Sequence, residues 1–168
     1  IEYLKSRDKL LGEAIDKIGY IERAVDEDLF SSVVNTIIGQ QISTAAHLTI
    51  SKRLDDKVGT ITPFTICEMD SAEMQKLGMT FRKVDYIKGF ADKVQSGEFD
   101  LEGFKNKTDA EVISELTSLR GIGPWTAEMI MTFSMKRPDI VSYGDLAILR
   151  GMRMLGTQSY RAFKCLSI

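Results

Sequence analysis

The sequence predicts an all-α fold, and three observations support this prediction. Apolar residues recur at helical spacing along most of the 168 residues, and capping side chains stand in front of the apolar runs. The alternating segments typical of paired strands do not occur, and neither do the Asn-Gly and Asp-Gly dipeptides typical of strand hairpins. The composition is 43% hydrophobic, which is sufficient for one compact core or two small lobes.

Capping side chains predict where the helices begin. The expected N-cap residues, in chain order, are Asp8, Asp28, Ser43, Thr62, Asp70, Thr80, Thr108 and Asp145. Pro63 suits the first helical position after its cap. Glu73 and Glu111 stand three residues after Asp70 and Thr108, which is the spacing of a capping box.

Glycines and polar segments predict where the helices end. The glycines expected just past helix ends are Gly19, Gly78 and Gly97. The second predicted helix should break at residues 39–42 (GQQI). The third should end near Leu54, before a polar loop over residues 55–60.

Residues 119–127 (LRGIGPWTA) carry the most specific local pattern, because helical runs over residues 108–118 and 124–135 flank them. Gly121 and Gly123 permit a turn that side chains would prevent, and proline then opens the next helix. The expected result is a hairpin of two helices whose backbone amides point outward at a helix N-terminus. Such a terminus favours a phosphate, although a plain glycine-capped turn would carry the same pattern.

Two further segments give the hairpin a family context. Residues 141–150 read VSYGDLAILR, and residues 35–43 read NTIIGQQIS. Together with the hairpin and with residues 77–83 (LGMTFRK), they resemble the helix-hairpin-helix DNA glycosylases of the Gly/Pro…Asp (HhH-GPD) type. The most similar branch is 3-methyladenine DNA glycosylase II. The resemblance covers nearly the whole chain.

The resemblance implies an architecture and a reaction. One helix-hairpin-helix unit over residues 1–168 should form two lobes with a cleft between them. We expect residues 30–114 in one lobe, and residues 1–29 and 115–168 in the other. The implied enzyme is a monofunctional DNA glycosylase of base excision repair, which hydrolyses the N-glycosidic bond of a damaged base, an alkylated purine, flipped out of double-stranded DNA. Two alternatives stay open: a glycosylase for a deaminated or mismatched base, and a non-catalytic DNA-binding module.

By resemblance, the hairpin grips the DNA backbone and the GQQI loop wedges into the base stack, with Gln41 the best wedge position. The implied DNA-binding residues are Gly121, Ile122, Gly123, Thr126, Arg120, Gln40 and Gln41. A polar loop between two helices is the plainer interpretation of the two glutamines. The glutamines together with Asp145 favour an enzyme, because a pure binder needs neither.

Asp145 is the candidate catalytic residue. A fixed carboxylate can stabilise the positive charge that grows on the sugar, and it can also orient or deprotonate water. A helix cap and nothing more is the alternative. Trp125 stands where strand-cutting relatives carry a lysine, so no Schiff base is expected there. Trp125, Tyr143 and Met129 are the expected walls of the base pocket, although Trp125 could instead be a core residue.

Cysteine and histidine content argues against a transition-metal site. Cys67 and Cys165 lack metal-ligand spacing and His47 is the single histidine, so no zinc, iron–sulfur cluster or required cofactor is expected. The family implies a monovalent cation, Na⁺ or K⁺, held by the carbonyls of Thr117, Leu119 and Ile122. No apolar run has membrane-spanning length, no signal peptide pattern is present, and the cysteine usage indicates a reducing compartment. We therefore expect a protein of the cytoplasm, associated with the nucleoid in a bacterium, or of the nucleus. We also expect a monomer.

Charge is unevenly distributed along the chain. The net charge of −2 alone argues against a nucleic-acid binder. From Leu119 onward there are seven basic and three acidic residues, a balance of +4, and before it fifteen and twenty-one, a balance of −6. The hairpin therefore belongs to the positive part, although a solvated charge pattern explains this as well.

One departure from the family follows the Asp145 helix, where residues 159–161 (SYR) resemble a family segment that normally lies further on.

Overall fold

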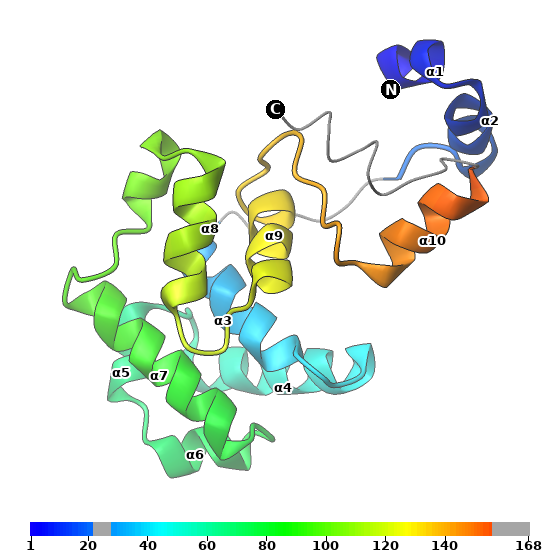
Figure 1. Cartoon of the computed structure of the whole chain (residues 1–168). Coiled ribbons are helices and arrows are strands. Elements are labelled where there is room, and N and C mark those ends of the chain that lie inside the picture. Colours follow the sequence, from blue (N-terminus) through cyan, green and yellow to red (C-terminus); the bar gives the residue numbers. More distant parts are fainter. Residues whose placement is uncertain (22–27, 156–168) are drawn as a thin grey trace. The chain divides into compact units, whose positions relative to one another are not determined.

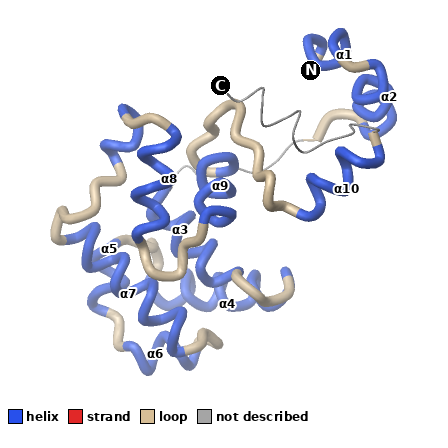
Figure 2. The backbone as a smooth tube through the Cα atoms, viewed as in Figure 1, coloured by secondary structure: helices blue, strands red, loops and turns tan. Residues whose placement is uncertain are grey.

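The computed structural model describes residues 1–21 and 28–155, and all regular structure in these residues is helical (Figures 1 and 2). No strand occurs in the described part of the chain, so the predicted all-α fold is confirmed. Residues 159–161, the segment that departs from the family pattern, lie outside the described residues.

Contacts between Cα atoms divide the chain into two compact units, residues 26–140 and residues 1–25 with 141–168. The second unit contains α1 (Glu2–Arg7), α2 (Lys9–Ile18) and α10 (Leu146–Met154). The first contains α3 (Leu29–Gly39), α4 (Thr44–Val58), α5 (Pro63–Glu68), α6 (Ser71–Lys76), α7 (Phe81–Gln95), the 3-10 helix η1 (Glu102–Asn106), α8 (Asp109–Ser118) and α9 (Pro124–Phe133). The division differs from the predicted lobes, because residues 115–140 pack with residues 30–114. Leu116 and Met131 are buried in the same core as Val33.

The core of the larger unit forms around α3. This helix buries six residues, including Phe30, Val33 and Ile37, and it contacts α4, α7 and α9. Apolar residues occur on most of its faces, as expected for a helix enclosed by others. The ring of Phe30 stacks on Phe90 of α7 at 5.0 Å between ring centroids, and further aromatic contacts extend the core toward η1. Figure 1 shows α8 and α9 side by side, joined by the hairpin.

The predicted caps are present. At every predicted N-cap the side chain accepts a hydrogen bond from a backbone amide of the first helical turn. The capping box of Thr108 and Glu111 forms as predicted. The box predicted at Asp70 does not: the carboxylate of Glu73 lies 3.3 Å from Lys57 of α4 instead.

The end of α4 differs from the sequence prediction. The helix continues to Val58, so the polar loop predicted over residues 55–60 is wrong for residues 55–58. Leu54 is fully buried, while the acidic residues that follow it face solvent on the outer side of the same helix. Lys52 and Asp56 form an i,i+4 ion pair at 3.0 Å across this outer side. The charged residues that suggest a loop in the sequence therefore lie on the solvated face of a continuing helix.

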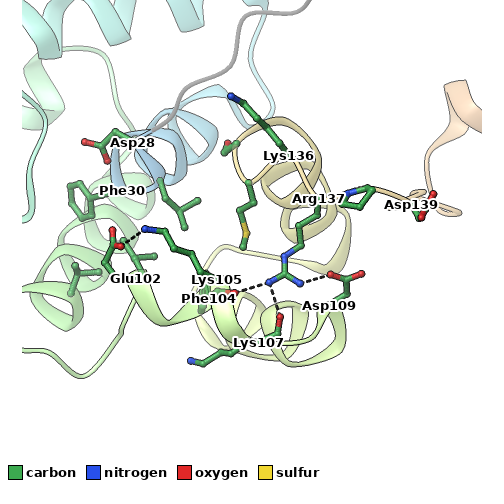
Figure 3. A pocket seen from close by; sticks show the side chains of 16 residues that line it. Asp28, Phe30, Glu102, Phe104, Lys105, Lys107, Asp109, Lys136, Arg137 and Asp139 are labelled. Atoms are coloured by element: carbon green, nitrogen blue, oxygen red, sulfur yellow. Dashed lines mark hydrogen bonds and ion pairs between the residues drawn. The ribbon is translucent and has the colours of Figure 1, made fainter. Parts of the chain in front are cut away.

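Arg137 joins η1 and α8 to the segment after α9 (Figure 3). Its guanidinium pairs with Asp109 and donates to the carbonyls of Phe104 at 2.6 Å and Lys107 at 2.7 Å, and its side chain is 16% exposed. We expect Arg137→Met to lower the free energy of unfolding by about 2–3 kcal/mol, because partly buried acceptors lose their donor. Urea unfolding measures this effect.

The control is Lys105→Met, because Lys105 pairs with Glu102 on the exposed surface of the same region. An exposed ion pair contributes little, so this variant should keep the urea midpoint of the parent. Equal midpoints for both variants would show that Arg137 does not fasten the segment.

Candidate nucleic-acid interface and active site

The hairpin between α8 and α9 is a tight turn fixed by backbone hydrogen bonds and by its apolar residues. The Leu119 amide donates to the Leu116 carbonyl at 3.2 Å, and the Ile122 amide donates to the Leu119 carbonyl at 3.1 Å. The side chains of Leu119 and Ile122 are buried in the core of the larger unit. Pro124 occupies the first turn of α9, as predicted. The two hydrogen bonds and the buried side chains of Leu119 and Ile122 thus fix the backbone of the turn to the core.

The two hairpin glycines have different roles. Gly121 has φ 88°, and a Cβ added there would lie 2.2 Å from the ring of Tyr86 on α7. Gly123 has φ −93° and ψ 173°, which any residue adopts, and a Cβ there would meet nothing within 4 Å. The prediction that the turn requires both glycines is therefore right for Gly121 and wrong for Gly123. Glycine at position 123 instead keeps the N-terminus of α9 uncovered.

The start of α9 is built differently from that of the other long helices. Gly123 is its N-cap, and no side chain caps the helix. The amides of a first helical turn and the helix dipole attract an anion. Thr126, predicted to be a DNA-binding residue, is only 7% exposed. The geometry suits a phosphate approached by backbone rather than by side chains.

The loop that joins α3 to α4 lies against the hairpin. The Gln40 side chain donates to the Gly121 carbonyl at 2.8 Å. Gln40 was predicted to contact DNA, and in the structure its amide group binds the hairpin. Gln41, the predicted wedge, is exposed and has φ 56°. The wedge position and the grip position therefore belong to the same unit and lie close together.

Two basic residues of this region have partners in the structure. Arg120, predicted to bind DNA, forms an exposed ion pair with Asp85 of α7 at 3.0 Å. Lys83 was not among the predicted site residues, although it lies in the segment that resembles the family. Its ammonium group donates to the carbonyls of Ile38 and Gln40, both at 2.7 Å, and burial lowers the pKa of Lys83. A signal for this role is absent from local sequence because the partners are more than forty residues away.

Trp125 and Met129 lie one turn apart on α9, which places them on one face of the helix. Trp125 is 48% exposed, so the alternative that it is a core residue is excluded. An exposed tryptophan directly after the hairpin can stack on an extruded base. Its role as a pocket wall stays a prediction.

Asp145 and Tyr143 belong to the smaller unit. The Asp145 amide donates to the Ser142 carbonyl at 3.0 Å, which closes a turn that contains Tyr143. The Asp145 carboxylate accepts hydrogen bonds from the amides of Ala147 at 2.7 Å and Ile148 at 3.0 Å. These bonds fix the carboxylate at the positive end of the α10 dipole. A cleft shared by Asp145 and the hairpin stays a prediction.

A cavity of about 1190 Å³ opens in the larger unit near Phe30, Phe104 and Met135 (Figure 3). It adjoins the start of α8 and the segment after α9, whereas the hairpin joins the end of α8 to the start of α9. Helices of ten residues separate the two places by roughly 15 Å. Arg137 at its wall already pairs with Asp109. This cavity is therefore not the predicted base pocket.

The described residues offer few groups that could bind a metal ion. They hold no cluster of three or more histidine, cysteine, aspartate or glutamate side chains that could bind a metal ion. The carbonyls of Thr117, Leu119 and Ile122 lie at the negative end of α8 and in the turn that follows it. The Leu119 carbonyl accepts one hydrogen bond and keeps a second lone pair. These groups fit a monovalent cation.

The described helices include none that is long and apolar enough to cross a membrane.

The fold and the hairpin define a helix-hairpin-helix protein, and comparison with known proteins places it in a family. The model of the HhH-GPD superfamily base excision DNA repair proteins matches residues 34–161. The match covers most of the chain, so the chain belongs to this superfamily.

Individual relatives agree with this assignment. DNA-3-methyladenine glycosylase 1 of Schizosaccharomyces pombe is 32% identical over 75% of this chain and 57% of the relative. DNA-3-methyladenine glycosylase of Saccharomyces cerevisiae is 35% identical over 74% of this chain and 46% of the relative. The chain thus spans about half the length of the curated relatives it matches.

Two solved structures share the fold. A DNA-3-methyladenine glycosidase from Bacillus halodurans has a TM-score of 0.81 and 32% identity, over 90% of this chain and 70% of its own. The S. pombe 3-methyladenine DNA glycosylase in complex with abasic DNA has a TM-score of 0.78 and 28% identity, over 90% of this chain and 77% of its own.

Proposed function

We propose that this chain is a DNA glycosylase that hydrolyses the N-glycosidic bond of an alkylated purine in double-stranded DNA. The observation that carries the proposal is the uncovered N-terminus of α9, where Gly123 replaces a capping side chain without any demand of the turn itself. The names of the relatives from both yeasts support the same chemistry, and support the alkylated purine over a deaminated or mismatched base.

The proposed reaction has three parts. The hairpin holds a backbone phosphate without reading sequence, through its amides and the helix dipole. The exposed Gln41 fills the space that the extruded nucleotide leaves, which offsets the cost of unstacking. Asp145, fixed by the Ala147 and Ile148 amides, stabilises the positive charge on the sugar and positions or deprotonates the attacking water.

The residue after Pro124 supports a monofunctional enzyme. Trp125 has no amine to attack the sugar. Lys136, 11 residues further along the chain, was expected on the same helix but lies beyond the end of α9 at Phe133, and the helix axis from Trp125 to that end measures roughly 12 Å. Water is therefore the proposed nucleophile, and the product is an abasic site in an intact strand.

We expect base release from duplexes that carry one alkylated purine, with strand breaks only after alkali or heat. Borohydride added during the reaction should trap no covalent protein–DNA adduct, because Trp125 stands where strand-cutting members of the family carry the lysine that forms a Schiff base. Parallel duplexes with a deaminated base and with a mismatch test lesion choice. Release from these alone would change the substrate class, and tight DNA binding without release from any duplex would indicate a binding module. A trapped adduct would overturn the monofunctional assignment.

The remaining properties are proposals of the same kind. Damaged double-stranded DNA is the proposed partner, and the chain acts as a monomer without a required cofactor. The carbonyls of Thr117, Leu119 and Ile122 hold Na⁺ or K⁺ and thereby stiffen the turn before the phosphate site. The proposed location is the cytoplasm or the nucleus, where DNA is present.

A further inference from the structure

Lys83 is half-buried, and its ammonium group binds two backbone carbonyls of another segment. Its ammonium group, on the first turn of α7, donates to the Ile38 and Gln40 carbonyls at 2.7 Å each. These carbonyls terminate α3, where backbone acceptors lack intrahelical donors and the dipole favours a cation. No ion pair with a carboxylate involves Lys83 in the described ranges 1–21 and 28–155. Its positive charge therefore stabilises the C-terminal end of α3.

Gln40 extends this contact to the hairpin. Its carbonyl accepts from Lys83, while its side chain donates to the Gly121 carbonyl at 2.8 Å. Gly121 in turn has no space for a Cβ, because Tyr86 of α7 lies against it. Lys83 and Tyr86 are on the same helix, so the three segments form a closed set of contacts. The loop after α3 is thereby fixed to the hairpin in one register.

The loop presents one residue from this fixed position. Gln41 is exposed and has φ 56°, a backbone conformation that residues other than glycine rarely adopt. Residues hold such a conformation when their surroundings determine it strongly. The neighbouring contacts of Lys83 and Gln40 supply that determination. A loop that merely connected α3 to α4 would need neither the half-buried lysine nor the left-handed glutamine.

We propose that Lys83 is a positioning residue for base extrusion, which holds the Gln41 side chain at a fixed distance from the phosphate grip. The proposal rests on the proposed glycosylase function. Without Lys83 the loop loses its register, so Gln41 must be ordered each time a base leaves the stack. Loss of Lys83 should slow extrusion of the base and not the bond-breaking step, because Lys83 contacts Ile38 and Gln40 and not Asp145.

The test compares one alkylated purine in a fully paired duplex with the same base in an unpaired bulge, where extrusion is easier. Single-turnover base release is measured with the full chain for the parent, Lys83→Met and Lys83→Arg. Lys83→Met should slow release about tenfold from the paired duplex and less than about threefold from the bulge. Lys83→Arg should restore the parental ratio, because a guanidinium can donate to both carbonyls.

Lys88→Met is the matched control. Lys88 lies on the same helix and likewise donates to two carbonyls, those of Cys67 at 3.1 Å and Met69 at 2.5 Å, at the C-terminal end of α5 and away from the hairpin. This variant should lose comparable stability and keep the parental ratio. A 2-aminopurine beside the lesion gives a readout without chemistry, since its fluorescence rises when the stack opens. The rise should be smaller for Lys83→Met than for Lys88→Met.

The outcomes separate the inference from the proposed function. Equal slowing on both substrates, or the same ratio change for Lys88→Met, would make Lys83 merely structural and overturn the inference. Unchanged release by Lys83→Met would overturn it as well. A parent that releases no base would count against the proposed function, and the fluorescence comparison would then decide on Lys83. If Lys83→Met fails to fold, Lys83→Gln takes its place.

Discussion

Replacing Asp145 by asparagine should lower the rate of base release by roughly 100-fold or more. Affinity for DNA should stay within a few-fold of the parent, because the phosphate grip is assigned to the hairpin of the other unit. Asparagine is well suited to this test. Its carbonyl oxygen can still accept from the Ala147 and Ile148 amides, so α10 keeps its cap while the negative charge is lost.

Asp8→Asn is the matched control for capping. Asp8 caps α2 in the same unit and accepts from the Leu11 amide at 3.0 Å, yet it has no proposed role in chemistry. Both variants should unfold at nearly the parental temperature, and only Asp145→Asn should lose base release in single-turnover assays. Near-parental excision by Asp145→Asn would leave Asp145 as a helix cap alone.

The sequence predicted the helix starts well, for a local physical reason. A capping side chain and the amides that it binds lie within three residues, so the pattern is visible in a short stretch. Asp28, Thr80 and Thr108 all cap the helices predicted for them. The turn chemistry of Gly121 and the position of Pro124 are local in the same sense.

Features that depend on distant partners could not be predicted in this way. The charged residues at the end of α4 suggest a loop, because a short stretch of sequence does not show that Leu54 on the opposite face is buried in the core. Gln40 looked like a DNA contact, because its partner Gly121 is 81 residues away. The sequence pattern does not separate the two hairpin glycines, because the folded backbone conformation and the position of Tyr86 distinguish them. In each case tertiary packing decides, and a single sequence does not display it.

The difference between the two hairpin glycines leads to opposite expected effects on stability. Gly121→Ala should lower the free energy of unfolding by about 2 kcal/mol or more, because a side chain at φ 88° is strained and its Cβ would meet Tyr86. Gly123→Asp should leave stability unchanged or raise it slightly. Its backbone is accessible to any residue, its Cβ has open space, and aspartate is a good N-cap for α9.

Gly123→Asp should nevertheless bind DNA at least about tenfold more weakly at roughly 0.1 M salt, whatever the sequence of the duplex. The new carboxylate would occupy the amides that hold the phosphate and would repel the DNA backbone. Because about one phosphate contact is lost, the slope of log affinity against log salt should decrease by about one. Fluorescence anisotropy with undamaged duplexes of two sequences, at several salt concentrations, measures both quantities.

Thr108→Asp controls for the added charge. It places a carboxylate at the N-cap of α8, the other hairpin helix, but at the end that lies away from the turn. The carboxylate can still accept from the Glu111 amide, although the hydrogen bond from the Thr108 hydroxyl to the Glu111 carboxylate is lost. This variant should bind DNA nearly as tightly as the parent, because a charge on the order of 15 Å from the phosphate site is largely screened at 0.1 M salt. If Gly123→Asp matched the affinity of Thr108→Asp at every salt concentration, the hairpin would not be the grip on DNA.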